Sequence, residues 1–106
     1  MSSEQWIDVG PAESVSDSQS FLTEVDGFPV VVVRCGDEYY AVEDRCTHDG
    51  EPLGTAEIED CKIICPRHGA QFCLRTGDAL TPPAYEPLRT FAVKSENGRL
   101  FIEIPT

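Results

Sequence analysis

Short runs of β-branched and aromatic residues, separated by pairs of turn-forming residues, dominate this chain. Each pair suits a two-residue β-hairpin turn, because such turns need positive φ angles that Gly, Asn and Asp tolerate. The predicted hairpins join 21–25 to 30–33 through Asp26-Gly27, 30–33 to 39–42 through Gly36-Asp37, and 91–93 to 100–104 through Asn97-Gly98. No long segment shows a clean 3.6-residue apolar period. We therefore predict an antiparallel β meander with little helix.

The valine run at 30–33 also predicts where its strand lies in the fold. A half-exposed strand would alternate apolar and polar residues, whereas Val30 to Val33 are all apolar. Such a strand is expected to be covered on both faces, in the middle of a sandwich or barrel. Residues 11–20, rich in Ser and acidic residues, predict a loop or one short helical turn. The predicted fold class is thus all-β, an antiparallel sandwich or barrel.

The length of 106 residues predicts a single domain over residues 1–106. Residues 45–87 differ from both flanks, because they contain both histidines, five of the eight prolines and four of the eight glycines. We expect this interval to be an irregular insertion on a β scaffold made of residues 1–44 and 88–106. No internal repeat or low-complexity segment is visible.

The charge excludes some partners. With 19 acidic and 8 basic residues, the formal net charge is −11, which argues against binding to nucleic acid or to an anionic membrane. This acidity fits either docking to basic partners or solubility alone.

The same sequence predicts a cytoplasmic location. Residues 1–10 lack the basic and apolar regions of an export signal, and no stretch approaches the roughly 18 apolar residues of a membrane span. The five cysteines are then expected in a reducing compartment, where thiols bind metal or sit buried more often than they form disulfides. Their odd number also leaves no complete disulfide framework.

Two Cys/His pairs carry the candidate chemistry. Cys46-Thr47-His48 and Cys65-Pro66-Arg67-His68 each offer one sulfur and one imidazole from a short loop. If the two loops face each other, Cys46, His48, Cys65 and His68 form a site with two sulfur and two nitrogen ligands. Such a ligand set suits either zinc or an iron-sulfur cluster.

The ligand spacing favours a cluster over zinc. Structural zinc usually draws ligands from knuckles such as C-x₂₋₄-C followed by H-x₃₋₅-H, whereas each loop here gives one sulfur and one nitrogen. In a cluster, the two cysteines can bind one iron and the two histidines the other. A structural zinc-binding interaction module remains the alternative.

The motifs resemble the two cluster-binding loops of Rieske proteins. The resemblance rests on Cys46-Thr47-His48-Asp49-Gly50 with Leu53-Gly54, and on Cys65-Pro66-Arg67-His68-Gly69-Ala70-Gln71-Phe72. Gly77-Asp78 and Thr81-Pro82-Pro83-Ala84 are similar to the turn and proline-rich loop that shield the cluster in that family, and the likeness extends over residues 4–104. It implies a Rieske-like β sandwich or barrel with a small cluster-binding subdomain of two loops. It also implies one 2Fe-2S cluster.

By this resemblance, Cys46 and Cys65 would bind the buried ferric iron, while His48 and His68 would bind the outer, reducible iron. Rieske subunits of respiratory complexes have a membrane anchor and two bridging cysteines, at positions held here by Glu51 and Arg67. The chain is instead similar to soluble ferredoxins of bacterial aromatic ring-hydroxylating dioxygenases. The catalytic iron domain of the large oxygenase subunits would not fit in 106 residues, so no enzyme activity of its own is expected.

The resemblance implies a monomeric one-electron carrier between an NAD(P)H-dependent flavoprotein reductase and a terminal ring-hydroxylating oxygenase. One alternative is a small subunit of an assimilatory nitrite reductase. Another, suggested only by the spare cysteines, is an iron-sulfur redox sensor or assembly accessory. We expect Cys35, Cys61 and Cys73 to be small buried apolar residues.

Overall fold

The described part of the chain forms three antiparallel sheets. The computed structural model describes residues 5–17, 19–45, 57–65, 69–81 and 86–103. Sheet A has the order β1 (Trp6–Pro11), β10 (Arg99–Glu103), β9 (Val93–Glu96). Sheet B has the order β2 (Ser20–Val25), β3 (Phe28–Cys35), β4 (Glu38–Glu43), β8 (Thr90–Phe91). Sheet C has the order β5 (Glu57–Glu59), β6 (Lys62–Ile64), β7 (Gln71–Cys73).

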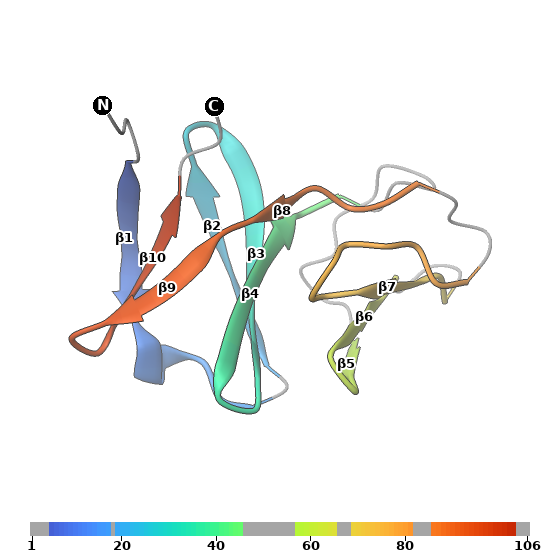
Figure 1. The fold of residues 1–106 in the computed structure, drawn as a ribbon, viewed down its shortest axis with the longest axis horizontal. Coiled ribbons are helices and arrows are strands. Elements are labelled where there is room, and N and C mark those ends of the chain that lie inside the picture. Colours follow the sequence, from blue (N-terminus) through green and yellow to red (C-terminus); the bar gives the residue numbers. More distant parts are fainter. Residues whose placement is uncertain (1–4, 18, 46–56, 66–68, 82–85, 104–106) are drawn as a thin grey trace.

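Along the longest axis of the molecule, sheet A lies at one end, sheet B in the middle and sheet C at the other end (Figure 1). A 3-10 helix at Ala12–Ser14 is the helical turn predicted within residues 11–20. The predicted all-β, antiparallel fold class is confirmed. Within the described ranges, no helix is long and apolar enough to cross a membrane.

The three predicted turns are present, but the first strand of the third hairpin was misplaced: it is β9, whereas Phe91 belongs to β8 and pairs with β4. Asp26 and Gly27 have φ angles of 50° and 84°, and Asn97 and Gly98 have 53° and 77°, as mirror-image hairpin turns require. Gly36 supplies a φ of 64° between β3 and β4. The hairpins do not form one meander, however. Strands β2, β3 and β4 follow one another in sheet B, whereas β9 and β10 pair in sheet A beside β1.

Strand β3 is covered on both faces, as its valine run predicts. All four valines are fully buried, and they alternate between two hydrophobic clusters. Val30 and Val32 pack toward sheet A with Leu100 and Ile102, whereas Val31 and Val33 pack toward sheet C. Since successive side chains of a strand point to opposite faces, one run of valines serves both cores.

Residues 45–87 are less irregular than predicted, because sheet C lies within them. Ile63 and Phe72, which are cross-strand partners in β6 and β7, are fully buried against Val31 and Val33. Sheet C is therefore joined to sheet B through an apolar core that both sheets share.

Candidate metal centre

Cys65 is the predicted ligand that the structure describes. It directly follows β6, its side chain is 1% exposed, and its thiol is free of any disulfide. Cys46, His48 and His68 lie outside the described residues. The described part of the candidate centre consists of Cys65 and the residues that surround it.

Backbone hydrogen bonds hold the two sides of the second motif together. The Cys65 N–H donates to the Ala70 carbonyl at 2.7 Å, and the Gly69 N–H donates to the Cys65 carbonyl at 3.0 Å. Gly69 has a φ of 73°, in the left-handed region that glycine adopts most easily. Strands β6 and β7 thus fix both ends of the loop that contains Cys65.

The Cys65 side chain lies in an apolar environment. Ala70 and Phe72 are fully buried, and with Leu74 and Leu88 they belong to the hydrophobic cluster that contains Cys65. No polar or charged side chain is buried among the described residues. Such a setting disfavours an uncompensated charge, so it fits a neutral sulfur or one bonded to a metal ion.

The start of the predicted proline-rich loop is held against this pocket. The Gln71 N–H donates to the Thr81 side-chain oxygen at 2.9 Å, and the Leu80 N–H donates to the Gln71 carbonyl at 2.7 Å. This anchoring role of Thr81 was not predicted, because a threonine beside prolines carries no signal of its distant partner. Pro82 and Pro83 lie outside the described residues.

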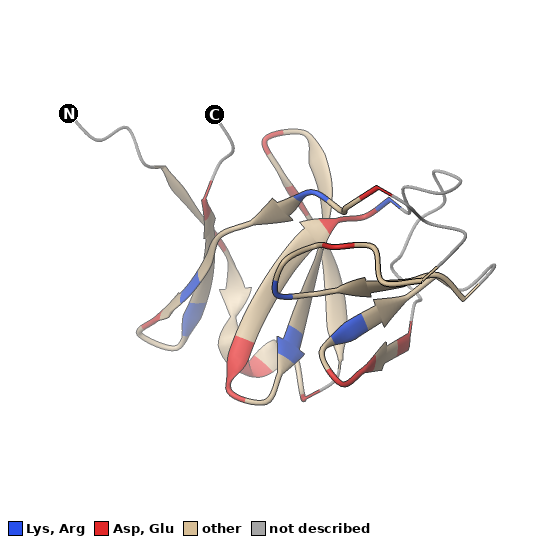
Figure 2. Cartoon of the chain, turned by 45° about the vertical axis from the view of Figure 1, so that its right-hand side comes forward, with Lys and Arg blue, Asp and Glu red and all other residues tan. Residues whose placement is uncertain are grey.

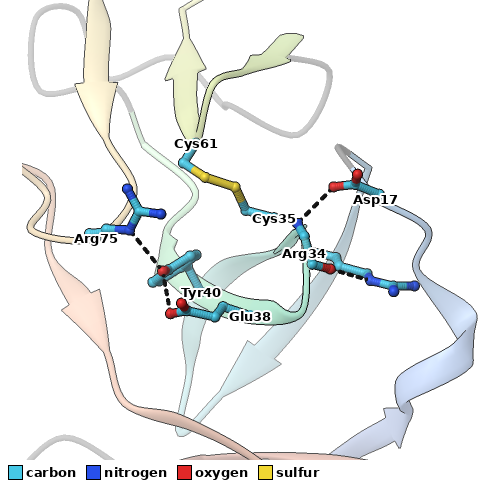
Figure 3. Close-up of a disulfide and its surroundings, with 8 residues drawn as sticks. Asp17, Arg34, Cys35, Glu38, Tyr40, Cys61 and Arg75 are labelled. Carbon is cyan, nitrogen blue, oxygen red and sulfur yellow. Dashed lines mark hydrogen bonds between the residues drawn. A yellow bond between two sulfur atoms is a disulfide. The ribbon is translucent and has the colours of Figure 1, made fainter.

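The prediction for the three spare cysteines was wrong. Cys35 and Cys61 form a disulfide with a Cα–Cα distance of 5.6 Å, and both are partly exposed (Figure 3). Cys73 is a free thiol and is also partly exposed. The disulfide residues lie at two hairpin turns, where backbone curvature brings side chains to the edge of the core rather than into it.

A hydrogen-bonded chain spans the same junction between sheets B and C. The Tyr40 hydroxyl donates to the Glu38 carboxylate at 2.7 Å and accepts from the Arg75 Nε–H at 3.2 Å (Figure 3). Partial burial of Tyr40, followed by the hydrogen bond to Glu38, raises the pKa of its hydroxyl. Tyr40 thus stays protonated near neutral pH and links a strand of the scaffold to the segment after β7.

The Cys73 thiol has a lowered pKa. The main cause is a hydrogen bond with the Thr76 side chain, and backbone groups of Thr76 and Arg75 add to it. In the β6–β7 ladder Cys73 is opposite Lys62, and its neighbour Phe72 points into the core. Because side chains alternate along a strand, Cys73 is on the face of sheet C away from that core.

The chain matches the family model of the Rieske [2Fe-2S] domain over residues 5–92. It is 38% identical over 97 residues to the 3-phenylpropionate/cinnamic acid dioxygenase ferredoxin subunit of Escherichia coli K12, a match that covers 90% of each chain. The ferredoxin of carbazole 1,9a-dioxygenase from Nocardioides aromaticivorans IC177 superimposes with a TM-score of 0.90 at 27% identity, over 96% of this chain and 99% of that one.

A similar match comes from a complex of reduced oxygenase and oxidized ferredoxin in carbazole 1,9a-dioxygenase. The matching chain of that complex superimposes with a TM-score of 0.86 at 32% identity, over 92% of the present chain and 91% of the matching chain. The family model and the ferredoxin structures define the class, an iron-sulfur electron-transfer domain. The chain belongs to the Rieske [2Fe-2S] family. Its cofactor is one 2Fe-2S cluster, and the predicted role as an electron carrier rather than a catalytic enzyme is confirmed.

Proposed function

We propose that Cys46, His48, Cys65 and His68 bind the 2Fe-2S cluster of a single Rieske domain that spans residues 1–106. The burial of Cys65 among apolar side chains, with its loop closed by hydrogen bonds, supports its part in this set. Val42 lies in the same hydrophobic cluster as Cys65 and belongs to β4, which ends shortly before Cys46 in the sequence. Both ligand loops therefore depart from elements that share one core.

The chain's proposed task is to take one electron from an NAD(P)H-dependent flavoprotein reductase and pass it to a terminal ring-hydroxylating oxygenase in the cytoplasm. The observation that carries this proposal is the identity of 38% to a dioxygenase ferredoxin subunit over 90% of both chains. The cluster supplies one-electron redox chemistry, while the chain supplies ligands, a dry pocket and a surface for partners.

The protein's charge also fits transient docking by a monomer. Acidic residues are spread over all three sheets rather than gathered on one of them (Figure 2). Asp26 lies in the β2–β3 turn, Asp60 in the β5–β6 turn and Glu96 at the end of β9. A net charge of −11 would steer a basic partner surface toward the protein, and salt would screen that attraction.

Stopped-flow mixing tests the proposed electron route. A candidate flavoprotein reductase and a candidate ring-hydroxylating oxygenase from the same organism are combined with NADH or NADPH, and product is measured with and without the ferredoxin. We expect product formation only with the loaded wild-type protein, and slower transfer as salt rises. A loaded protein that neither accepts electrons from any candidate flavoprotein nor reduces the oxygenase would refute the route.

A further inference from the structure

The disulfide joins the tips of two hairpins from different sheets. Cys35 is the last residue of β3, paired with Glu38 across the Gly36-Asp37 turn, and Cys61 follows Asp60 in the turn from β5 to β6. The bond therefore connects the scaffold to sheet C two residues from Val33 and from Ile63, which belong to the hydrophobic cluster that also joins them. Figure 3 shows the two sulfur atoms bridging these hairpins.

The backbone at Cys61 points to a specific role for this cysteine. Asp60 and Cys61 have φ angles of 50° and 59°, the left-handed values that Asn-Gly usually supplies in a two-residue hairpin. A cysteine is disfavoured at such a position because its Cβ crowds the backbone. The local preference is therefore for glycine, whereas the side chain of Cys61 carries the sulfur that bonds to Cys35.

Hydrogen bonds position both hairpin tips for this bond. The Gly36 N–H donates to the Asp17 carboxylate at 2.8 Å, and the Arg34 Nε–H donates to the Gly36 carbonyl at 2.8 Å (Figure 3). On the other side, the Leu74 N–H donates to the Cys61 carbonyl at 3.0 Å. The Cα–Cα distance of 5.6 Å lies within the range that disulfides span without backbone movement.

We propose that Cys35 and Cys61 form a reversible redox couple, a thiol pair that low-molecular-weight disulfides oxidise and thiols reduce, and that its disulfide clamps sheet C onto the scaffold. In oxidation, the thiolate of one cysteine attacks a disulfide such as oxidised glutathione and releases one thiol. The second cysteine then attacks the mixed disulfide and releases the other thiol. The chain loses two electrons and two protons, and the glutathione disulfide becomes two glutathione molecules.

Reduction of this clamp leaves the fold intact. The hydrophobic cluster around Phe72 and the Tyr40–Arg75 hydrogen bond still connect sheets B and C. Both disulfide residues are partly exposed, whereas Cys65 is 1% exposed, so solution thiols reach the couple before the candidate cluster ligand. The redox state of the couple thus changes how firmly sheet C is held.

Differential alkylation of the loaded, full-length protein tests the couple. The protein is equilibrated in glutathione buffers of increasing oxidised fraction, alkylated and digested without reduction, while visible absorption reports the cluster. We expect one cross-linked peptide containing Cys35 and Cys61 to appear with oxidation and disappear with reduction, at constant absorption. Cys73, a single free thiol, can form a mixed disulfide with glutathione but should appear in no cross-linked peptide, so it serves as the internal control. Absence of this peptide at every ratio, or its formation only after cluster loss, would overturn the proposal.

Urea unfolding tests the clamp. Cross-linking residues 26 positions apart should lower the unfolding equilibrium constant on the order of a hundredfold relative to the reduced protein. The redox dependence should vanish in Cys35→Ser, whereas Cys73→Ser should keep it. Cys61→Gly should be more stable than Cys61→Ser, because glycine relieves the turn. Equal stability of the oxidised and reduced wild-type forms would refute the clamp.

Discussion

Replacing Gly77 by alanine should destabilise the junction between sheet C and the scaffold more than any surface substitution. The Gly77 N–H donates to the Cys73 carbonyl at 2.7 Å, and its own carbonyl accepts the Leu88 N–H at 2.7 Å. A Cβ at this position would lie 2.5 Å from the Leu88 carbonyl oxygen and 2.9 Å from the Thr90 side chain. Since the Leu88 oxygen belongs to the backbone, the chain leading into β8 would have to move.

The size of the effect follows from three contributions. A non-glycine residue at a φ of 81° costs about 1 to 2 kcal/mol. Losing the hydrogen bond between Leu88 and Gly77 adds about 1 kcal/mol. Displacing a packed segment adds about 1 to 3 kcal/mol. The free energy of unfolding should therefore fall by about 3 to 6 kcal/mol, a large part of the roughly 5 to 15 kcal/mol typical of a small domain.

Gly98→Ala is the matched control for this substitution. Gly98 has a φ of 77°, but a Cβ there would meet nothing within 4 Å, so only the conformational cost of about 1 to 2 kcal/mol remains. Urea unfolding followed by circular dichroism and by visible absorption measures both variants. Equal losses of stability in Gly77→Ala and Gly98→Ala would show that the contact with Leu88 does not matter.

Three further substitutions test the surroundings of Cys65 and the thiol of Cys73. High-potential relatives carry a Ser and a Tyr at the positions of Ala70 and Phe72, and these two residues offer no hydroxyl to cluster sulfur. The reduction potential should therefore lie near the low end of the Rieske range, about −150 mV. Ala70→Ser and Phe72→Tyr should each raise the reduction potential, measured by voltammetry, by some tens of millivolts. A hydrogen bond to a charged group is worth roughly 1.5 to 3 kcal/mol, and a tenfold change in the equilibrium constant for one electron corresponds to about 59 mV. Unchanged potentials would mean that the hydroxyls do not reach the sulfurs. Thr76→Val should raise the pKa of Cys73 by removing its main hydrogen bond, so alkylation of Cys73 near neutral pH should slow and its pH profile should move to higher pH. An identical profile would remove Thr76 as the cause.

The parts of the fold that sequence analysis predicted are those with strong local signals. Asp26-Gly27 and Asn97-Gly98 predicted their hairpins because few residue pairs tolerate two positive φ angles in succession. Asp60 and Cys61 adopt the same conformation without a glycine, so the β5–β6 hairpin was missed. Strand β1 was missed as well, because its partner β10 lies at the other end of the chain and supplies the pairing that its mixed sequence does not indicate.

The candidate site also has features that the local sequence predicts and others that it does not. Ligand types and spacing predict the four ligands from sequence. The burial of Cys65 agrees with its place at the end of the apolar run Ile63-Ile64, two residues after the buried Ile63. The disulfide could not be predicted, because it depends on two turns that are distant in sequence and on a junction between sheets. General rules on cysteine number and compartment pointed away from it, and the tertiary arrangement of Cys35 and Cys61 overrides them.

Electron paramagnetic resonance of the chemically reduced, full-length protein is the most direct test that this chain is a Rieske electron carrier with the proposed ligands. The wild-type protein should contain two irons and two labile sulfides per chain, as expected for one 2Fe-2S cluster, and its signal should be that of mixed histidine and cysteine ligation. His48→Ala and His68→Ala should each abolish this signal, whereas Cys73→Ser should preserve it. An unchanged signal in either histidine variant, or a colourless protein that contains zinc, would contradict the assignment.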